Sequence, residues 1–250
     1  MAERIDLAQV SYRYQSEGRE VLAVDNVSFH VEASEFLCVL GPSGCGKTTI
    51  MNMIAGFLSP SSGEIRIGGE KLNGKRRDRG VVFQDFAQLF PWRTARRNVE
   101  FGLQMRQVDG ARRKETALDF LRLVGLEKFA DAYPHQLSGG MQQRVSIARA
   151  LAYNPGVLLM DEPFAALDAM TRDEMQRLVT KVWSETRKTV VYITHNVSEA
   201  VYLGDKVLVL DAHPGKVRAE FRLDLPRPRD PLSPGFIEAQ REIMNALGLH

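Results

Sequence analysis

The residues from Gly41 to Thr49 have the composition and spacing of a phosphate-binding loop. They follow an apolar run at 36–40 and lead directly into a helical pattern. Glycines let the backbone fold back so that several N–H groups point at one anion, and the positive end of the following helix adds to the attraction. We therefore predict that this loop binds a triphosphate, with Lys47 on the β- and γ-phosphates and the Thr48 hydroxyl on Mg²⁺. The predicted contacts, of which Thr49 is the weaker one, are Gly41, Pro42, Ser43, Gly44, Cys45, Gly46, Lys47, Thr48 and Thr49.

Two carboxylates follow another apolar run further along the chain. The run at 156–160 leads into Asp161 and Glu162. A strand of this kind beside a phosphate loop puts the first carboxylate near the metal and the second near the γ-phosphate, where it can polarise a water molecule. A pair of acids at a strand end is commonly just a solvated loop. The triphosphate loop in the same chain makes the catalytic interpretation the stronger one.

Two other polar residues follow apolar runs, as residues at the edge of an α/β sheet do. His195 comes directly after the run at 189–194, and Gln84 ends the run that begins at Gly80. Ligands of open α/β sheets bind outside the carboxyl ends of the strands. A lone histidine is usually structural or exposed, but this position would let His195 touch a phosphate. Gln84 fits the same edge, and it fits a surface amide equally well.

The segment around Ser138 has the features of a second anion site. Ser138, Gly139 and Gly140 precede an apolar helical face, and serine is a preferred residue for capping the start of a helix. A helix N-terminus attracts anions in the same way as the phosphate loop does. Capping requires only the serine, so the double glycine indicates close approach of a charged group. Ordinary capping stays open for this segment taken alone.

The chain in front of the phosphate loop predicts an antiparallel β-layer. Residues 4–14 and 26–31 alternate apolar and polar side chains, and a turn is expected at 15–19. Tyr12 and Tyr14 lie on one face of the first strand, because side chains alternate along a strand. An aromatic ring near the strand end can stack on a nucleotide base. Each tyrosine alone is more often part of sheet packing.

The rest of the chain fits one domain over residues 1–250, the upper size range of a compact domain. Helical periodicity from about Thr94 onward predicts a helical subdomain over about 94–155, inserted between strands. Turn residues and prolines followed by a short amphipathic pattern predict a Pro-rich C-terminal extension over about 226–250. We expect no second domain.

Composition excludes several classes of function. The chain is 44% hydrophobic and 26% charged with a net charge of +2, so its charge gives no indication of a nucleic-acid partner. Cys38 and Cys45 form neither a disulfide framework nor a metal-ligand pattern, which fits a reducing cytoplasm. No apolar stretch approaches the roughly 20 residues of a membrane helix, and the N-terminus lacks a signal-peptide core. If the protein works at a membrane, another chain spans it.

Two surface segments leave their roles open. The stretch from Phe86 to Trp92 is apolar and aperiodic, and Pro91 would break any helix there. Such a patch is either offered to a partner or packed inside its own lobe. The basic run Lys75–Arg79 could bind phosphate, but its length and its internal Asp78 favour a solvated turn.

Six motifs occur in the order found in the ATP-binding subunit of an ATP-binding cassette (ABC) transporter, and the chain resembles that family over nearly its whole length. They are the phosphate loop, Gln84, LSGGMQQR at 137–144, LLMDEP at 158–163, ALD at 166–168 and His195. The Ser-Gly-Gly motif ahead of LLMDEP separates the chain from GTPases and simple kinases. The resemblance implies an α/β fold: a RecA-like P-loop NTPase core with an N-terminal antiparallel β-layer and an inserted α-helical subdomain. It implies ATP and Mg²⁺ as ligands.

The resemblance also implies individual roles. Tyr14 would stack on adenine, and Gln84 would sense the metal and the attacking water. Asp161 would bind Mg²⁺ through water, Glu162 would be the general base, and His195 would contact the γ-phosphate.

In this family two copies hold two ATP molecules between them, each signature segment capping the nucleotide of the other copy. Ser138 and Gly140, with Gly139 between them, would make these contacts. Met141 stands where many members carry glutamine, and Gln142 is displaced by one position, so the resemblance assigns no role to that amide.

Two segments, QLFPWRTARRNV at 88–99 and DEPFAALDAMTR at 161–172, are similar to the ATPases of importers for nitrate, sulfonates, taurine and related small solutes. Such a subunit would lie at the cytoplasmic face of the inner membrane. It would contact transmembrane permease subunits near Phe86–Trp92, in a complex with an extracytoplasmic solute-binding protein. The alternative is a soluble, non-transport ABC ATPase acting on nucleic acid or ribosomes, but those usually carry two cassettes or a long coiled coil. A regulator that only binds nucleotide is disfavoured because Glu162 and His195 are both present.

Overall fold

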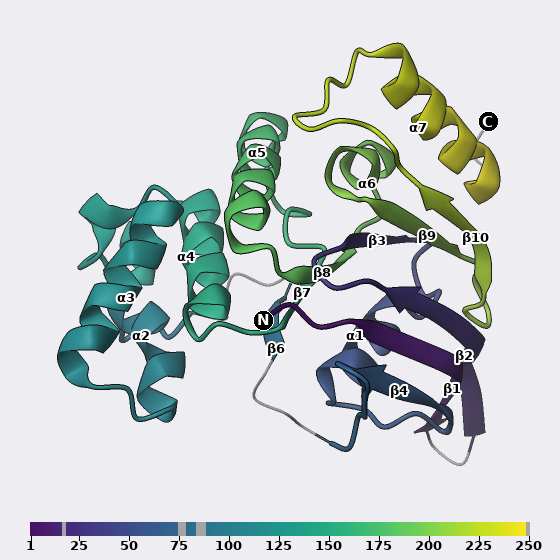
Figure 1. The fold of residues 1–250 in the computed structure, drawn as a ribbon, viewed down its shortest axis with the longest axis horizontal. Coiled ribbons are helices and arrows are strands. Elements are labelled where there is room, and N and C mark those ends of the chain that lie inside the picture. Colours follow the sequence, from purple (N-terminus) through teal and green to yellow (C-terminus); the bar gives the residue numbers. More distant parts are fainter. Residues whose placement is uncertain (17–18, 75–78, 84–88, 249–250) are drawn as a thin grey trace.

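The structure is a computed structural model and describes residues 1–16, 19–74, 79–83 and 89–248. A six-stranded sheet with the order β10-β9-β3-β8-β7-β6 forms its centre (Figure 1). All neighbouring pairs are parallel except β10–β9. Its strands are β3 (Phe36–Leu40), β6 (Arg79–Val82), β7 (Val157–Asp161), β8 (Thr189–Ile193), β9 (Lys206–Leu210) and β10 (Val217–Arg222). Four of them, β3, β7, β8 and β9, are buried along their whole length, which explains their continuous apolar runs.

The expected antiparallel layer is a four-stranded sheet with the order β2-β1-β4-β5. Its strands are β1 (Ile5–Ser16), β2 (Arg19–Val31), β4 (Ser62–Ile67) and β5 (Glu70–Lys71). The expected turn at 15–19 was too wide, and the second strand, expected at 26–31, begins at Arg19. The strands continue to the pair Ser16 and Arg19, because cross-strand pairing runs on through Gln15 and Glu20. Pairing with a neighbouring strand outweighs the weak strand preference of these polar residues.

Helix α1 (Lys47–Ala55) packs in one apolar core with strands of both sheets. Alternate residues of the central strands face this core, because side chains alternate along a strand. They are Leu37, Val39, Val157, Leu159, Val191, Ile193, Leu208 and Leu210. Helix α1, which follows β3 after the phosphate loop, is therefore held in place by buried apolar side chains of both sheets.

The intervening residues of the same strands face a second core, which three helices and the C-terminal helix cover. These helices are α4 (Gly139–Ala152), α5 (Ala169–Thr186), α6 (Val197–Leu203) and α7 (Pro234–Leu247). Asp168 caps α5, and its side chain accepts from Thr171 N. The apolar face of α5 is buried at Met175, Val179, Val182 and Trp183.

Helices α2 (Ala95–Met105) and α3 (Gly110–Leu123) pack with α4 around a third core at one side of the molecule (Figure 1). Thr94 caps α2 and Asp109 caps α3 through bonds to backbone N–H groups. Two short 3-10 helices, η2 (Glu127–Phe129) and η3 (Pro134–Gln136), connect α3 to α4. Across the described ranges, no helix combines the length and apolar character that a membrane span requires.

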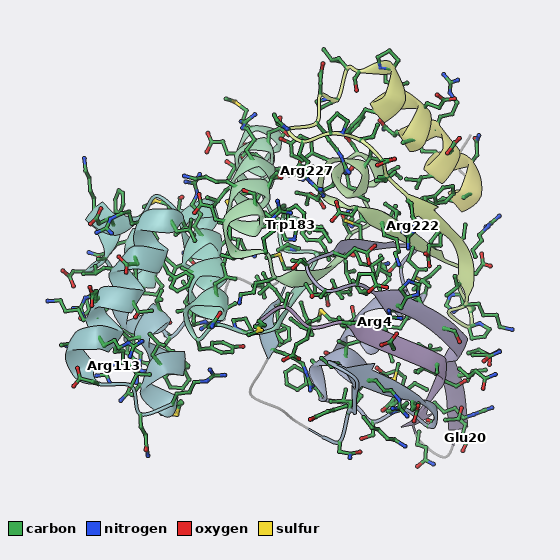
Figure 2. The ribbon with its side chains drawn as sticks, viewed as in Figure 1. Arg4, Glu20, Arg113, Trp183, Arg222 and Arg227 are labelled. Atoms are coloured by element: carbon green, nitrogen blue, oxygen red, sulfur yellow. The ribbon has the colours of Figure 1, made fainter. Side chains whose placement is uncertain are left out.

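The C-terminal segment crosses back over α5 and α6 before it forms α7. Figure 2 shows Arg227 beside Trp183 of α5, and its guanidinium carbon lies 4.4 Å from the centre of that ring. Arg227 also pairs with Asp205. Phe236 and Ile243 of α7 are buried. The extension is therefore packed as part of the core that covers the central sheet.

Candidate active site

The loop between β3 and α1 surrounds the ammonium group of Lys47. Lys47 Nζ donates to the carbonyl oxygens of Gly41 at 2.7 Å and Pro42 at 2.9 Å. The side chain is only 7% exposed. Helix α1 begins at Lys47 with Gly46 as its N-cap, and no side chain caps it. A buried cation and uncapped first-turn N–H groups together make a site for an anion.

Two glycines give this loop its shape. Gly44 and Gly46 have φ angles of 78° and 87°, which L-residues with a side chain rarely adopt. A Cβ on Gly46 would lie 2.8 Å from Ala23 O and 2.9 Å from Val24 Cγ2. Glycine is therefore required at position 46 both for the turn and for the close approach of β2.

Thr48 and Asp161 meet at the start of α1. The Thr48 hydroxyl donates to Asp161 Oδ2 at 3.0 Å. Asp161 ends the buried strand β7, and burial raises the pKa of its carboxyl, while the bond from Thr48 acts in the opposite direction. A hydroxyl and a carboxylate beside a phosphate site are the oxygen donors that Mg²⁺ takes from proteins, with water and phosphate completing its shell. The two residues fit a magnesium site.

Glu162 and His195 form a second pair beside the loop. Glu162 Oε2 lies 3.0 Å from His195 Nδ1, and His195 is exposed. Glu162 has a φ angle of 41°, and its N–H donates to Ile193 O at 3.0 Å. A left-handed backbone at a residue with a side chain costs about 1–3 kcal/mol and is often found at functional sites. The turn directs the backbone out of β7 at the edge where Glu162 enters the pocket.

Lys47, Thr48 and Glu162 line a pocket of about 580 Å³. Asp161 and His195 are absent from the described residues of its wall and adjoin it through Thr48 and Glu162. Its walls come from the β1–β2 hairpin, the phosphate loop, the end of β7 and the β9–β10 connection. They are Tyr14, Val21, Leu22, Ala23, Ser43, Gly44, Gly46, Lys47, Thr48, Thr49, Glu162 and His213. The structure thus brings the phosphate loop together with the carboxylate at the end of β7.

The two tyrosines of β1 are placed differently. Tyr14 is 40% exposed, lines the pocket and shares a hydrogen bond of 3.1 Å with the hydroxyl of Thr49. Tyr12 packs against the core between the sheets. The rings meet edge to face with centroids 4.8 Å apart. Of the two, Tyr14 has the ring that a nucleotide base in this pocket can reach.

The start of α4 is separate from the pocket. Ser138 is exposed, and its Oγ caps the helix by accepting from Met141 N at 3.3 Å. Ser138, Gly139 and Gly140 are absent from the described residues that line the pocket. The Gln142 side chain donates to the carbonyl oxygens of Pro134 and Leu137, so its amide is engaged within this segment.

Several expectations fall on residues outside the described ranges. Gln84 and Phe86 belong to them, as do the first four residues of the basic run at 75–79. Arg79, the last of that run, is only 5% exposed and donates to Ile54 O at 3.0 Å. The expected solvated turn was therefore wrong for Arg79, because β6 begins there and carries the residue into the interior.

The sequence analysis missed His213 and the β2 residues of the pocket wall. His213 is only part of a turn in the sequence, and β2 is an ordinary alternating strand. Their positions depend on the docking of the β9–β10 connection against β2, where Asp25 N donates to Gly215 O at 3.0 Å. No local pattern carries that information.

Comparisons with known proteins agree with this geometry. A family model described as ABC transporter matches residues 24–165. An uncharacterized ABC transporter ATP-binding protein of Methanocaldococcus jannaschii is 48% identical over 247 residues, covering 99% of this chain and 92% of that protein. The taurine import ATP-binding protein TauB of Rhizobium johnstonii is 50% identical over 226 residues, covering 90% and 85%. The nitrate import ATP-binding protein NrtD of a Synechocystis strain is 47% identical over 206 residues, covering 82% and 77%.

A solved structure is also similar over most of the chain. It is the dimeric post-hydrolysis state of the ATP-binding cassette MJ0796, bound to ADP and Pi. The TM-score is 0.77 at 38% sequence identity, with 88% of this chain and 98% of that chain covered. This similarity agrees with the expected α/β P-loop architecture.

Proposed function

The chain belongs to the ABC transporter family, and from this premise we propose that it is the ATP-hydrolysing subunit of an importer for a small solute such as nitrate, a sulfonate or taurine. The observation that carries the proposal is that Lys47, Thr48 and Glu162 line one pocket. Asp161 is bonded to Thr48, and His195 is in contact with Glu162. The relatives named for taurine and nitrate import support transport over the alternative of a nucleic-acid or ribosome ATPase.

ATP would lie along the pocket with its triphosphate on the loop from Gly41 to Thr49. The carbonyl oxygens that now hold Lys47 Nζ would give way to phosphate oxygens, which are stronger acceptors. Tyr14 would stack on the adenine ring, since its face borders the same pocket. Thr48 and Asp161, together with Gln84, would hold Mg²⁺.

Hydrolysis would depend on Glu162 and His195. Mg²⁺, when bound, neutralises charge on the β- and γ-phosphates. Glu162 would accept a proton from the attacking water as general base, and its left-handed backbone sets the direction of the side chain. His195 would hold the γ-phosphate while its contact with Glu162 keeps the carboxylate oriented.

A second copy of the chain would complete the site. The start of α4 lies outside the pocket of its own chain, and Ser138 and Gly140 would contact the ATP held by the other copy. The dimeric structure of the similar cassette supports this arrangement. The closed dimer would be stable only while the γ-phosphate is present, because both helix ends bind it.

The permease would bind near Trp92, whose side chain is 70% exposed. Beside it runs a mainly apolar groove of about 480 Å³ between β6, α2 and α4, and Phe90 lies in its wall. Leu89 is buried, so the patch expected at 86–92 is divided between packing and surface in its described part. This placement would put the subunit on the cytoplasmic face of the inner membrane. A solute-binding protein would deliver the solute from the other side.

Purification of the chain with its native partners tests the proposal. We expect a multi-spanning membrane protein to co-purify and to depend on Trp92, with ATP hydrolysis stimulated by the solute and its binding protein. A matched variant, Leu232→Ala, removes another exposed apolar side chain, which lies in the C-terminal segment between β10 and α7. Co-purification of RNA or ribosomes in place of a membrane protein would refute the transport function.

A further inference from the structure

One wall of the pocket has no role in the proposed mechanism. It is the connection between β9 and β10, residues 211–216, which brings the exposed side chain of His213 to the pocket. The His213 ring lies close to the phosphate loop: a Cβ on Gly44 would be 3.5 Å from His213 Cε1. The imidazole therefore brings its ring nitrogens within contact range of the middle of the phosphate loop.

The connection is fastened at Gly215 and Lys216, shortly after His213 in the chain. Gly215 N donates to Ala23 O at 3.0 Å, and Asp25 N donates to Gly215 O at the same distance. Lys216 Nζ pairs with Asp25 Oδ2 at 2.9 Å. A Cβ on Gly215 would lie 2.2 Å from Cys45 O, so this glycine packs directly against the phosphate loop. These contacts fix the backbone of the connection to β2 and place it against the phosphate loop.

The backbone at His213 is also unusual. Its φ angle is 53°, in the left-handed region that a residue with a side chain seldom adopts. Such a conformation persists where surrounding contacts over-determine it, and it is found preferentially at binding sites.

Sheet order places His213 on the flank that the catalytic residues leave open. Strand β3, which leads into the phosphate loop, lies between β9 and β8. Asp161 and His195 follow β7 and β8, so they approach the loop from one side, and the β9–β10 connection approaches it from the other. The middle of such a loop cradles the α- and β-phosphates.

We propose that His213 is a nucleotide-binding residue that donates a ring N–H to the α,β-diphosphate portion of ATP or ADP. This inference rests on the proposed function, since it requires that the pocket binds nucleotide. It assigns a contact that is independent of the γ-phosphate, and it predicts that ATP and ADP are held equally by this side chain.

Equilibrium titration of ATP, ADP and adenosine with the full chain tests the proposal. We expect His213→Ala and His213→Phe to weaken ATP and ADP binding by about 3- to 10-fold and to leave adenosine binding unchanged. His213→Gln should keep ATP affinity within about twofold, because its amide retains an N–H donor of similar reach. His30→Ala is the matched control, since His30 lies at the far end of β2 from the pocket residues.

The outcomes separate this proposal from the function on which it rests. If the wild-type chain binds ATP and both donor-free variants bind it as tightly as His30→Ala does, the His213 contact is refuted while the ATPase function stands. An equal loss for adenosine would place the ring on the base or ribose and would overturn the phosphate assignment. If the wild-type chain fails to bind ATP, the proposed function itself is wrong. The His213→Phe variant keeps a ring at the left-handed position, so it carries the test even where His213→Ala does not fold.

Discussion

The N-termini of α1 and α4 are both suited to an anion, but only the α1 end is built into a pocket. At α1 the buried Lys47 ammonium, the Thr48 hydroxyl and the carboxylate of Glu162 share one cavity. No side chain caps this helix, so its first N–H groups are available to a ligand. At α4 the exposed Ser138 satisfies one N–H with its own hydroxyl.

The difference shows how one chain can separate binding from turnover. In the proposed function the α1 end would hold the groups that retain a nucleotide, whereas the α4 end would add a contact only to a nucleotide held by another copy. Affinity should therefore depend on the α1 side of a single chain, and turnover should depend on both ends. Variants at the two ends make this comparison testable.

The largest effect is expected from Glu162→Gln, which keeps both helix ends and removes the base. Hydrolysis should fall by about 10²-fold or more, because a positioned acid–base group contributes on that scale. ATP should still bind, and an ATP-dependent dimer should accumulate. Phosphate release and size-exclusion chromatography with ATP measure the two effects. Glu185→Gln, an exposed change on α5, is the control. Turnover at the normal rate would place the base elsewhere.

Removal of the buried Lys47 ammonium should weaken nucleotide binding at the α1 end. Lys47→Ala should weaken ATP binding by about 10- to 100-fold, because a charge-assisted hydrogen bond contributes about 1.5–3 kcal/mol. The measurement is an equilibrium titration with a fluorescent ATP analogue, and Lys181→Ala on the exposed side of α5 is the control. Unchanged affinity would contradict the assignment of the loop to phosphate.

A change at the α4 end should leave single-chain affinity intact. Ser138→Ala should keep ATP affinity within about twofold at dilute protein, while turnover and ATP-dependent dimerisation fall by roughly tenfold, about 1.4 kcal/mol. The lost cap also costs about 1 kcal/mol of folding stability.

Thr94→Ala provides the matched control for that cap. Thr94 caps α2 by accepting from Arg97 N at 3.3 Å, the same distance as the Ser138 bond to Met141 N. It should lose comparable stability and retain normal turnover without the permease. If both variants slow turnover equally, the effect of Ser138 is only structural.

Much of the α1 end could be predicted from local sequence. Buried strands β3, β7, β8 and β9 are continuous apolar runs, and the glycines of the phosphate loop mark positions that require unusual backbone angles. Ser138 was predicted as a helix cap, and its side chain accepts from Met141 N. Each of these features depends on a few neighbouring residues.

The rest depends on contacts between distant segments. The left-handed backbone of Glu162 reflects how the end of β7 joins β8, and the place of His213 reflects the docking of the β9–β10 connection on β2. Strands β1 and β2 extend into the expected turn because each pairs with the other. Tertiary pairing of this kind overrides weak local preferences.

The smallest effect concerns a buried carboxylate on α6, close to His195 in the chain. Glu199 is 4% exposed; its Oε2 accepts from the Thr194 hydroxyl at 2.5 Å, and its N–H donates to Asn196 Oδ1 at 3.1 Å. Thr194 and Asn196 lie on either side of His195 in the chain, so Glu199 positions the loop that carries His195. Burial raises the pKa of Glu199 above its ordinary value.

A raised pKa means that ionisation of the Glu199 carboxyl lowers the free energy of unfolding. This stability penalty is complete above the folded-state pKa. As the pH falls through that pKa the penalty disappears, because the folded chain binds the proton more tightly than the unfolded chain does. Glu199→Gln retains an acceptor for Thr194 and removes the charge. Its free energy of unfolding should exceed that of the wild type by up to about 1 kcal/mol at pH 8, with a smaller difference at pH 5. Urea unfolding at both pH values measures this, and Glu185→Gln, on the surface, should show no such trend. A gain in the free energy of unfolding of Glu199→Gln that grows on acidification would show that partners stabilise the ionised carboxylate. The loop that carries His195 would then depend on the charge of Glu199.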